Sequence, residues 1–405
     1  MTSFDTSPQL NVWRVLLALA VVFVMLATTG WTAVRHSRET SALRASLAAW
    51  EDGRVAGRDL PDPHAAPTRL ARFFASLTAS QRLSLARRYP LAVGNMNGAP
   101  VELRYRANRI ALREQTGIER TRMRDRRLSP SGQHEAGRRM QRFQSMSRAH
   151  RQILAFDPEG SGRAAEVFGD LDRAERVSVV VPGVDTALLT FQRTYRKYSA
   201  PVGMAKALYA AEHEVSPTTR TAVIAWADYT SPAGLGIDSA TAMRAEYGAV
   251  RLAALLRALP GRAPVSLFCH SYGSVVCGVA AHTLPDRVTD IAVAGSPGMR
   301  VEKATQLRTS ARVWAMRDAD DWIQDVPYLE LGGLGHGADP VSSAFGARVL
   351  SAREAKGHGG YFEPGTDSLR NLAGIGTGAY LSVRCAGDDD TCRAGLSGTT
   401  TAGRA

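Results

Sequence analysis

The pentapeptide Cys269-His270-Ser271-Tyr272-Gly273 contains a serine in a setting that suits nucleophilic chemistry. A serine hydroxyl attacks a carbonyl carbon only when a base removes its proton, and a sharp strand-to-helix turn, the nucleophile elbow, can present it to that base. Small residues two positions before and after the serine relieve crowding in this turn. Gly273 fills the second position, and Cys269 fills the first, where glycine is usual, so Cys269→Gly is expected to be well tolerated. We therefore predict that Ser271 is a nucleophile.

A carboxylate that orients the catalytic histidine is expected after the serine in the chain. Residues 317–323 (RDADDWI) follow an apolar strand pattern and contain three aspartates. Asp321, which precedes Trp322 and Ile323, is the preferred acid. Asp318, which is closer to the end of the strand, is the alternative. Aspartates of this cluster that are not the triad acid are expected to be solvated loop charges.

Two later histidines lie in glycine-rich loops, where an imidazole can reach a neighbouring side chain. His358 occupies the last loop before the final predicted helix, where the histidine of such a triad belongs, and it is preferred as the general base. His336, in the segment GHGAD, is the alternative. His270, next to the serine, is expected to face away from it by strand geometry and to be structural.

The negative charge of a tetrahedral intermediate needs two preorganised N–H donors. The main-chain N–H of Tyr272, directly after the serine, is the first expected donor. The second is expected from the loop after the first core strand, and the N–H of Val184 is preferred there. The alternative for this loop is that Asp185 and Thr186 simply cap the next helix.

Strand and helix patterns alternate from residue 176 onward, which is typical of a parallel sheet with helices on both faces. Apolar and β-branched runs predict strands at residues 177–181, 221–226, 264–269, 290–294 and 311–316. Helical spacing predicts helices at residues 188–198, 204–212, 240–259, 274–284 and 366–372. The third strand runs directly into Ser271, so the pattern predicts the strand-to-helix turn that the serine chemistry requires.

The first third of the chain shows helical spacing and no catalytic cluster, with helices predicted at residues 42–50, 69–89, 101–113 and 132–154. We therefore predict an N-terminal tail, a transmembrane anchor, a polar stalk, a helical arginine-rich region that packs on the core, a catalytic domain and a polar, disordered tail. The tail spans residues 1–14, the anchor 15–34 and the stalk 35–67. The helical region spans residues 68–175, the catalytic domain 176–380 and the disordered tail 381–405.

Residues 15–34 form an uncharged apolar run of twenty residues, about the length that spans a bilayer. Trp13 and Trp31 lie near its ends, as interfacial anchors do. An uncleaved anchor is preferred over a cleaved signal peptide, because no clear cleavage site follows the run. The short N-terminal tail favours an exported catalytic domain, which we expect. The positive-inside rule favours the opposite orientation, through Arg35, Arg38 and Arg44.

The four cysteines of the chain fall into two pairs. Cys269 and Cys277 belong to the predicted active-site strand and helix and are expected to be free and buried. Cys385 and Cys392, with six residues between them, are expected either to form a disulfide in an oxidising compartment or to remain unpaired in the tail. No Cys/His spacing resembles a zinc site. We therefore expect neither a metal nor another cofactor.

The formal net charge of +12 is concentrated in one segment. Residues 101–151 hold 14 arginines and five acidic residues. Such a segment suits lipid phosphates or nucleic acid, but solvated, arginine-faced helices are the preferred interpretation. No nucleic-acid-binding motif is present, so no nucleic acid partner is expected.

Several segments together resemble an actinobacterial α/β-hydrolase family whose members are largely uncharacterised. The resemblance covers residues 86–374 and lies in the segments VGNMNGAP (93–100), YRANR (105–109), VVPGVDT (180–186), HSYGS (270–274), DWI (321–323) and GHGADP (335–340). It implies the α/β-hydrolase fold and a triad of Ser271, Asp321 and His358. It implies no substrate, and the family usually has glycine at the position of Cys269.

Three functions fit these observations. The preferred one is a membrane-anchored serine esterase that cleaves a small or lipid-like acyl substrate through an acyl-enzyme. A peptidase or amidase with the same triad is the second, because substrate pockets are built by loops that the motifs do not describe. The third is a non-catalytic, membrane-anchored interaction protein that keeps the fold as a scaffold. The ordered series Ser271, Asp321 and His358 favours an enzyme over the scaffold.

Overall fold

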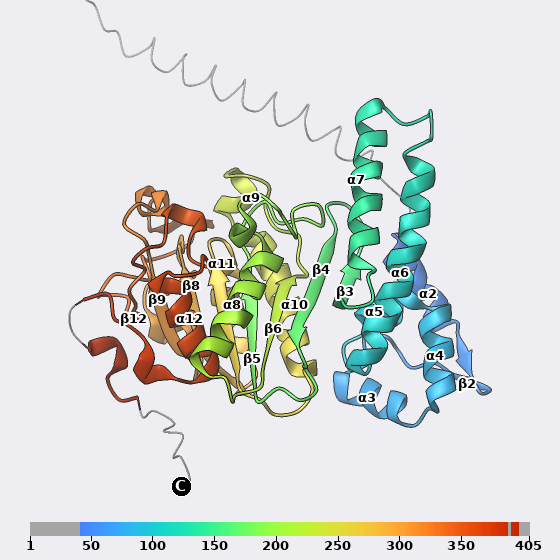
Figure 1. Ribbon diagram of the computed structural model, residues 1–405, viewed down its shortest axis with the longest axis horizontal. Helices are drawn as coiled ribbons and strands as arrows, with labels where there is room; N and C mark the ends of the chain where they lie inside the picture. Colours follow the sequence, from blue (N-terminus) through green and yellow to red (C-terminus); the bar gives the residue numbers. More distant parts are fainter. Residues whose placement is uncertain (1–40, 388–389, 397–405) are drawn as a thin grey trace, which may run out of the picture.

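The computed structural model describes residues 41–387 and 390–396 of the chain. Its centre is a sheet of eight strands in the order β12-β9-β8-β7-β5-β6-β4-β3 (Figure 1). The strands are β3 (Gln152–Asp157), β4 (Arg163–Gly169), β5 (Arg176–Val181), β6 (Thr221–Ala227), β7 (Val265–His270), β8 (Val288–Ala294), β9 (Arg312–Met316) and β12 (Arg348–Val349).

The sheet is parallel from β12 to β6, and β4 and β3 continue it in antiparallel pairings. The five strands predicted from apolar runs are confirmed within a few residues. Strands β3 and β4 lie in the region that was predicted to be helical up to residue 175, so that prediction was wrong there. These strands were missed because both are mixed in composition. Glu166 of β4 pairs with Arg151, and Arg163 of β4 pairs with Asp157 of β3.

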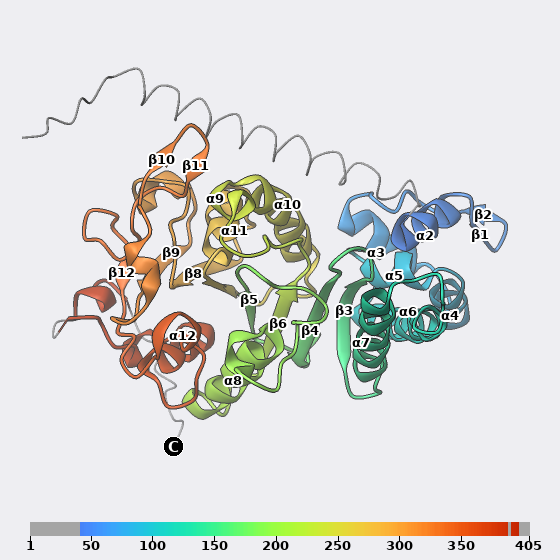
Figure 2. The same ribbon diagram turned by 90° about the horizontal axis from the view of Figure 1, so that it is seen from above.

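Helices cover both faces of the sheet, as Figure 2 shows. Helices α8 and α12 lie on one face, and α10 and α11 lie on the other. Pro201 begins α8, where a missing N–H costs nothing. Thr366 caps α12 by accepting the N–H of Leu369. The helices of this half are α8 (Pro201–Val215), α9 (Ile237–Ala240), α10 (Met243–Ala258), α11 (Gly273–Ala280) and α12 (Asp367–Thr377).

A helical region packs beside β3 at one edge of the sheet (Figures 1 and 2). It comprises α2 (Ala42–Glu51), β1 (Arg54–Val55), β2 (Arg58–Asp59), α3 (Pro67–Ala75), α4 (Ala79–Arg88), α5 (Pro90–Asn95), α6 (Val101–Arg122) and α7 (Pro130–Met146). The described part of the expected stalk, residues 41–67, is not a stalk. Trp50 is fully buried against Phe74 and Tyr89. Burial of these three aromatic rings together removes a large apolar area from water and stabilises the fold.

Side-chain amides fasten these helices to the edge strand β3. Asn95 bonds both the N–H and the carbonyl of Phe156, at 3.0 and 2.7 Å. Asn108 donates to the carbonyls of Gly94 and Ile153, each at 2.9 Å. A Cβ on Gly94 would lie 2.0 Å from the Asn108 amide oxygen, so this contact requires glycine. The two side-chain amides form hydrogen bonds with backbone groups that an edge strand would otherwise leave unpaired. The family segments at residues 93–100 and 105–109 therefore have a structural role.

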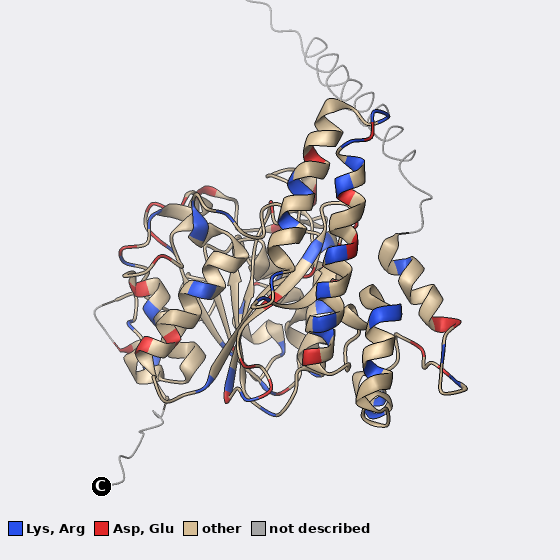
Figure 3. Ribbon diagram, turned by 45° about the vertical axis from the view of Figure 1, so that its right-hand side comes forward, with Lys and Arg blue, Asp and Glu red and all other residues tan. Residues whose placement is uncertain are grey.

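The arginines of α6 and α7 are not all solvated. Figure 3 shows basic residues along both helices of this hairpin. Arg104 and Arg139 are buried, and the Nε of Arg139 lies 2.8 Å from Oε1 of Glu119. Arg151, just after the hairpin, is buried against Glu166 of β4. Several of the cations in this segment therefore hold the hairpin to itself and to the sheet.

Two predicted helices differ from the structure. Residues 188–198 form turns that end in the short 3₁₀ helix η1 (Lys197–Ser199). Thr190 bonds back to the carbonyl of Asp185 at 2.7 Å, and such local bonds compete with helix formation. The helix predicted over residues 132–154 ends at Met146, and β3 begins at Gln152.

The C-terminal segment is ordered over much of its described part. Cys385 and Cys392 form a disulfide, which is the first of the two alternatives that the sequence left open. The prediction of disorder from residue 381 was wrong for residues 381–387 and 390–396. Leu350 pairs with Cys385, which attaches this segment to the chain next to β12. The predicted anchor at 15–34 lies outside the described residues. None of the helices within 41–387 and 390–396 is long and apolar enough to cross a membrane.

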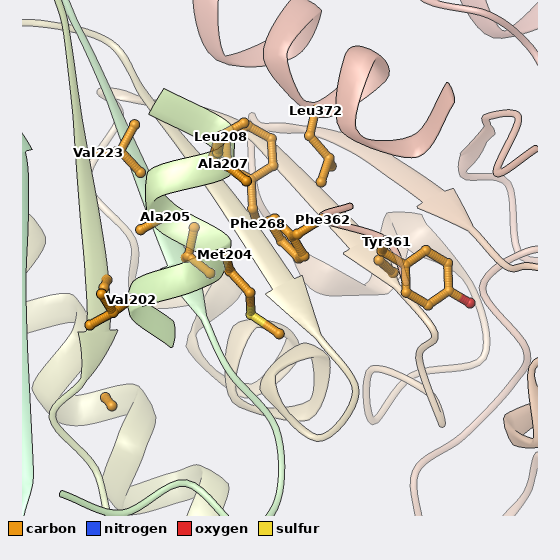
Figure 4. Packing of buried hydrophobic residues seen from close by; sticks show 14 of the residues in the cluster. Val202, Met204, Ala205, Ala207, Leu208, Val223, Phe268, Tyr361, Phe362 and Leu372 are labelled. Atoms are coloured by element: carbon orange, nitrogen blue, oxygen red, sulfur yellow. The ribbon is translucent and has the colours of Figure 1, made fainter. Parts of the chain in front are cut away.

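The core between the sheet, α8 and α12 extends up to the candidate site. Figure 4 shows Met204, Phe268, Phe362 and Leu372 of this cluster, with Tyr361 at its margin. Tyr361 is fully buried, but its hydroxyl points out of the apolar cluster and donates a hydrogen bond to Asp321. Packing in the core thereby fixes one partner of a carboxylate that the sequence singled out.

Candidate active site

Ser271 lies at a sharp turn between β7 and α11. Its φ is +55°, a value that is uncommon for residues other than glycine and that marks local strain. A Cβ on Gly273 would lie 2.2 Å from the carbonyl oxygen of Val181, and one on Gly183 would lie 2.6 Å from the Cβ of Ser271. Both glycines are therefore required by close approach, and the turn has the geometry of a nucleophile elbow.

The structure brings Ser271, His358 and Asp321 into one hydrogen-bonded chain. Nε2 of His358 lies 2.8 Å from Oγ of Ser271. Nδ1 of His358 lies 2.8 Å from Oδ1 of Asp321 and 3.1 Å from Oδ2. The three residues follow β7, β12 and β9, so they meet at the carboxyl ends of parallel strands, where open α/β sheets bind ligands.

Asp321 is held as a carboxylate although it is fully buried. Burial alone would raise its pKa, but hydrogen bonds from His358, Tyr361 and the N–H of Ile323 outweigh burial, and the pKa lies below its ordinary value. The Ile323 N–H lies 2.9 Å from Oδ1. An ionised carboxylate in this position can fix the orientation of the imidazole and stabilise its protonated form.

Asp318, the alternative acid, contacts neither His358 nor His336 through its carboxylate. Its Oδ2 accepts the N–H of Gly357 at 2.8 Å, and its own N–H bonds the Tyr361 hydroxyl at 3.0 Å. Asp318 therefore holds the loop that carries His358.

His336, the alternative base, lies away from the chain formed by Ser271 and Asp321. Its Nε2 lies 2.7 Å from the carbonyl of Ser239, and its ring packs edge-on against Tyr272. Burial lowers its pKa.

His270 does not face away from the site as predicted. Its Nε2 lies 2.6 Å from the carbonyl of His358, and the two imidazole centroids are 4.9 Å apart. Burial, together with the charge that His358 can carry, lowers the pKa of His270 to about 3. The prediction failed because strand alternation was extended to the last residue of β7, where the chain already bends into the turn.

Cys269 and Cys277 are not free: they form a disulfide. The bond joins the end of β7 to the middle of α11 and so spans the turn at Ser271. Both cysteines are buried as predicted. The pairing was missed because a separation of eight residues does not by itself predict a contact. Here β7 turns directly back into α11, and this turn brings the two cysteines together.

The expected N–H donors border the serine. Val184 and Tyr272 both line a cavity with Ser271. Within the described part of the chain, neither main-chain N–H has a hydrogen-bond acceptor among the turn and loop contacts. The hydroxyl of Tyr272 donates to the carbonyl of Thr241 at 2.8 Å, which holds the first residue after the serine in place.

Comparison with known proteins agrees with this geometry. Residues 157–331 match the model of a family described as alpha/beta hydrolase. The matched segment, which is less than half of the chain, is similar to α/β hydrolases. The match begins at the end of β3 and ends at β10 (Glu330–Leu331), so it includes Ser271 and Asp321 of the hydrolase domain and ends before His358.

Curated relatives of this chain are actinobacterial and uncharacterised, as the motifs implied. A protein of Mycobacterium tuberculosis is 26% identical over 381 residues, which cover 79% of this chain and 57% of the relative. A protein of Mycobacterium bovis is 34% identical over 150 residues, which cover 36% of this chain and 55% of the relative. The chain thus spans a little over half the length of these curated relatives.

Among solved structures, the chain is similar to a dienelactone hydrolase from Anabaena variabilis, with 17% identity and a TM-score of 0.32. The similarity covers 56% of this chain and 94% of that one. A predicted CIB-like hydrolase from Thermoplasma acidophilum has 16% identity and a TM-score of 0.34, over 57% and 97% of the two chains.

Two cavities of the hydrolase domain meet at Ser271. One has a volume of about 560 Å³, is largely polar, and includes His270, His358, Arg193 and Lys356 in its wall. The other has a volume of about 490 Å³ and is largely apolar, with Leu235, Leu329, Leu331 and Leu334 in its wall. The leucines at its mouth lie on the loop before α9 and on the hairpin of β10 and β11 (Leu334–Gly335). Among the residues described, no cluster of three or more His, Cys, Asp or Glu side chains could hold a metal ion.

Proposed function

We propose that this protein is a serine hydrolase that cleaves carboxylic esters through an acyl-enzyme. The observation that carries the proposal is the continuous chain from Ser271 Oγ through His358 to Asp321, with 2.8 Å at each junction. The match of residues 157–331 to a family described as alpha/beta hydrolase supports it. The sequence order of the three residues is the order expected for this fold.

In the proposed reaction, Oγ of Ser271 attacks the ester carbonyl while Nε2 of His358 takes its proton. The imidazolium that forms is stabilised by the carboxylate of Asp321, whose lowered pKa keeps it ionised. His358 then passes the proton to the leaving alcohol as the carbon–oxygen bond breaks. A water molecule attacks the acyl-enzyme with His358 again as the base, which releases the acid and regenerates Ser271.

The main-chain N–H groups of Val184 and Tyr272 are our candidates for the oxyanion hole. They flank Ser271 in the apolar cavity. Two fixed donors stabilise charge that develops only in the transition state, which is commonly the largest contribution to this type of catalysis. The apolar cavity beside them suits an aliphatic acyl group.

We further propose that the catalytic domain is exported and is anchored through residues 15–34. Disulfides persist in oxidising compartments, and the described residues contain two of them. A C-terminal alkaline phosphatase fusion tests this orientation, because that reporter is active only after export. An inactive fusion together with a stable chain would refute export.

Labelling of the purified full-length chain with a fluorophosphonate probe tests the nucleophile. We expect labelling of the wild type and none of Ser271→Ala. Ser216→Ala, at the far end of α8, is the matched control and is expected to label normally. Absent labelling of the wild type, or equal labelling of Ser271→Ala, would refute the proposal.

The choice of base and of bond type follows from the same preparation. His358→Ala is expected to slow labelling by about 10³-fold or more, whereas His336→Ala is expected to label at a rate near that of the wild type. Initial rates on p-nitrophenyl octanoate and on a peptide p-nitroanilide then separate an esterase from a peptidase. A higher rate on the anilide would show that the protein cleaves amide bonds in preference to esters.

A further inference from the structure

The two cavities at Ser271 differ sharply in the chemistry of their walls. Val184, Ser271 and Trp322 line both, so the serine sits at the junction. The ring of Trp322, which lines both cavities, lies at a centroid distance of 4.7 Å from the ring of His358. An ester bound at Ser271 therefore extends its acyl part into one cavity and its alcohol part into the other.

The position of His358 decides which part lies where. The leaving alcohol receives its proton from Nε2 of His358, so it must lie on the side of the serine that His358 occupies. His358 lines the polar cavity and not the apolar one. Of the two proposed N–H donors, Tyr272 lines only the apolar cavity, and Val184 lines both. The alcohol thus belongs to the polar cavity, and the acyl chain belongs to the apolar cavity.

The polar cavity carries cations that have no partner. Arg193, Arg196 and Lys356 line it, and within the described residues none of the three forms an ion pair with a carboxylate. Arg196 lies only over the ring of Tyr195. The carboxylates of Asp185 and Glu363 also line this cavity. Asp185 accepts the N–H of Gly234 at 2.8 Å.

The apolar cavity has the opposite character. None of its described lining residues is Asp, Glu, Lys or Arg. Leu331 and Leu334 at its mouth are 77% and 53% exposed, which is costly for leucine unless an apolar ligand covers them. Cations on the alcohol side and leucines on the acyl side together describe one amphipathic ligand.

We infer that the substrate is an ester between an aliphatic acyl chain and an alcohol that carries a phosphate group. Guanidinium groups match the geometry of phosphate oxygens and bind them through paired charge-assisted hydrogen bonds. The inference rests on the proposed function, since it takes Ser271 as the attacking group and His358 as the acid. It adds the class of alcohol, which the triad alone leaves open.

Three octanoyl esters with an anionic, a neutral and a cationic alcohol test this inference. They are 1-octanoylglycerol 3-phosphate, 1-octanoylglycerol and octanoylcholine, hydrolysed by the full-length chain below their micellar concentrations. We expect kcat/KM to be at least tenfold higher for the phosphate ester than for the neutral one, and lowest for the cationic one. Most of the difference should lie in KM, because the phosphate is remote from the reacting carbon. Added salt should shrink it.

The variant Arg193→Gln/Arg196→Gln/Lys356→Gln is expected to bring the phosphate-to-neutral ratio close to one. Arg138→Gln, at an exposed arginine of α7 that does not line the cavity, is the matched control and should keep the ratio. Equal rates on all three esters, or a preference for the cationic one, would overturn the inference while leaving the esterase intact. A chain that labels at no serine would instead refute the proposed function.

Binding provides a readout that does not depend on turnover. Calorimetric titration of Ser271→Ala with octyl phosphate and with octyl glucoside compares the two head groups on the same alkyl chain. We expect octyl phosphate to bind at least tenfold more tightly, and we expect the cation-free variant in the same background to lose this difference. Equal affinities in the Ser271→Ala protein would refute a phosphate site.

Discussion

The imidazole of His270 donates a hydrogen bond from Nε2 to the main-chain carbonyl of His358, at 2.6 Å. A carbonyl only accepts, so the hydrogen must reside on Nε2 of His270. Its pKa of about 3, lowered by burial and by His358, means that His270 stays neutral at physiological pH. A neutral donor suits this place, because a second imidazolium 4.9 Å from His358 would oppose the proton transfer that the proposed mechanism requires.

His270 is therefore a positioning residue, and its hydrogen bond can be tested by replacement. His270→Gln keeps an N–H donor and is expected to retain kcat/KM within about threefold. His270→Phe fills a similar space without a donor and is expected to lose about 10- to 100-fold, mainly in kcat, since small displacements of a catalytic group are costly. Thermal unfolding of both variants serves as the control. Equal activity of the two variants would contradict the positioning role.

The two candidate acids make different contacts and should differ in effect. Asp321→Asn is expected to lower kcat by about 10³- to 10⁴-fold, because an amide neither fixes the tautomer of His358 nor stabilises its charge. Asp318→Asn should cost about tenfold or less, since its amide oxygen can still accept the N–H of Gly357. Exposed Asp320 supplies the control Asp320→Asn. If Asp318→Asn were the more damaging change, the assignment of the acid would be wrong.

The sequence was most informative where one local pattern determines the structure. Apolar and β-branched runs located the five central strands, because strands buried on both faces need no alternation. The order of Ser271, Asp321 and His358 could be predicted from the chain because loops at the carboxyl ends of parallel strands converge. The structure brings these three residues together, and their catalytic roles remain a proposal.

Features that depend on contacts between distant segments were missed. β3 and β4 contain charged residues whose partners, such as Arg151 for Glu166, lie on neighbouring elements. The upstream motif of Gly94 and Asn108 gave no sign of its function, because that function is to fasten α5 and α6 to the edge of a sheet. The contact of His270 with His358 joins residues 88 positions apart and has no local signature.

The disulfide between Cys269 and Cys277 changes the expectation for Cys269→Gly, which now would break a cross-link and leave Cys277 unpaired. We expect Cys269→Ala/Cys277→Ala to lose about 2–3 kcal/mol of unfolding free energy, from the entropy of closing a short loop. We also expect about tenfold lower kcat/KM, because the bond spans the strained turn at Ser271.

A matched control for this pair is Cys385→Ala/Cys392→Ala, which removes a loop of similar length beside β12. Its loss of stability in chemical unfolding should be comparable, and its activity should be that of the wild type. Equal activity of both double variants would show that the bond at the turn supports only stability.

Buried Glu212 of α8 should make the stability of the fold depend on pH. Burial raises its pKa to about 7, against the hydrogen bond from Ser178 and the charge of Arg176. Between its ordinary pKa near 4.5 and 7, the folded protein keeps a proton that the unfolded chain has released, so stability falls as pH rises through this window and levels off above it.

Glu212→Gln removes this titration, and urea unfolding of both proteins at several pH values isolates it. From pH 5 to pH 8 the wild type is expected to lose about 2–3 kcal/mol relative to the variant, as a shift of this size implies. Any constant cost of the amide beside Ser178 cancels, because only the change of the difference with pH is compared. If the difference in unfolding free energy between the two proteins does not vary with pH, Glu212 is ionised in the fold. The buried Oε2 of Glu212, which has no hydrogen-bond partner among the described residues, would then need a partner beside it.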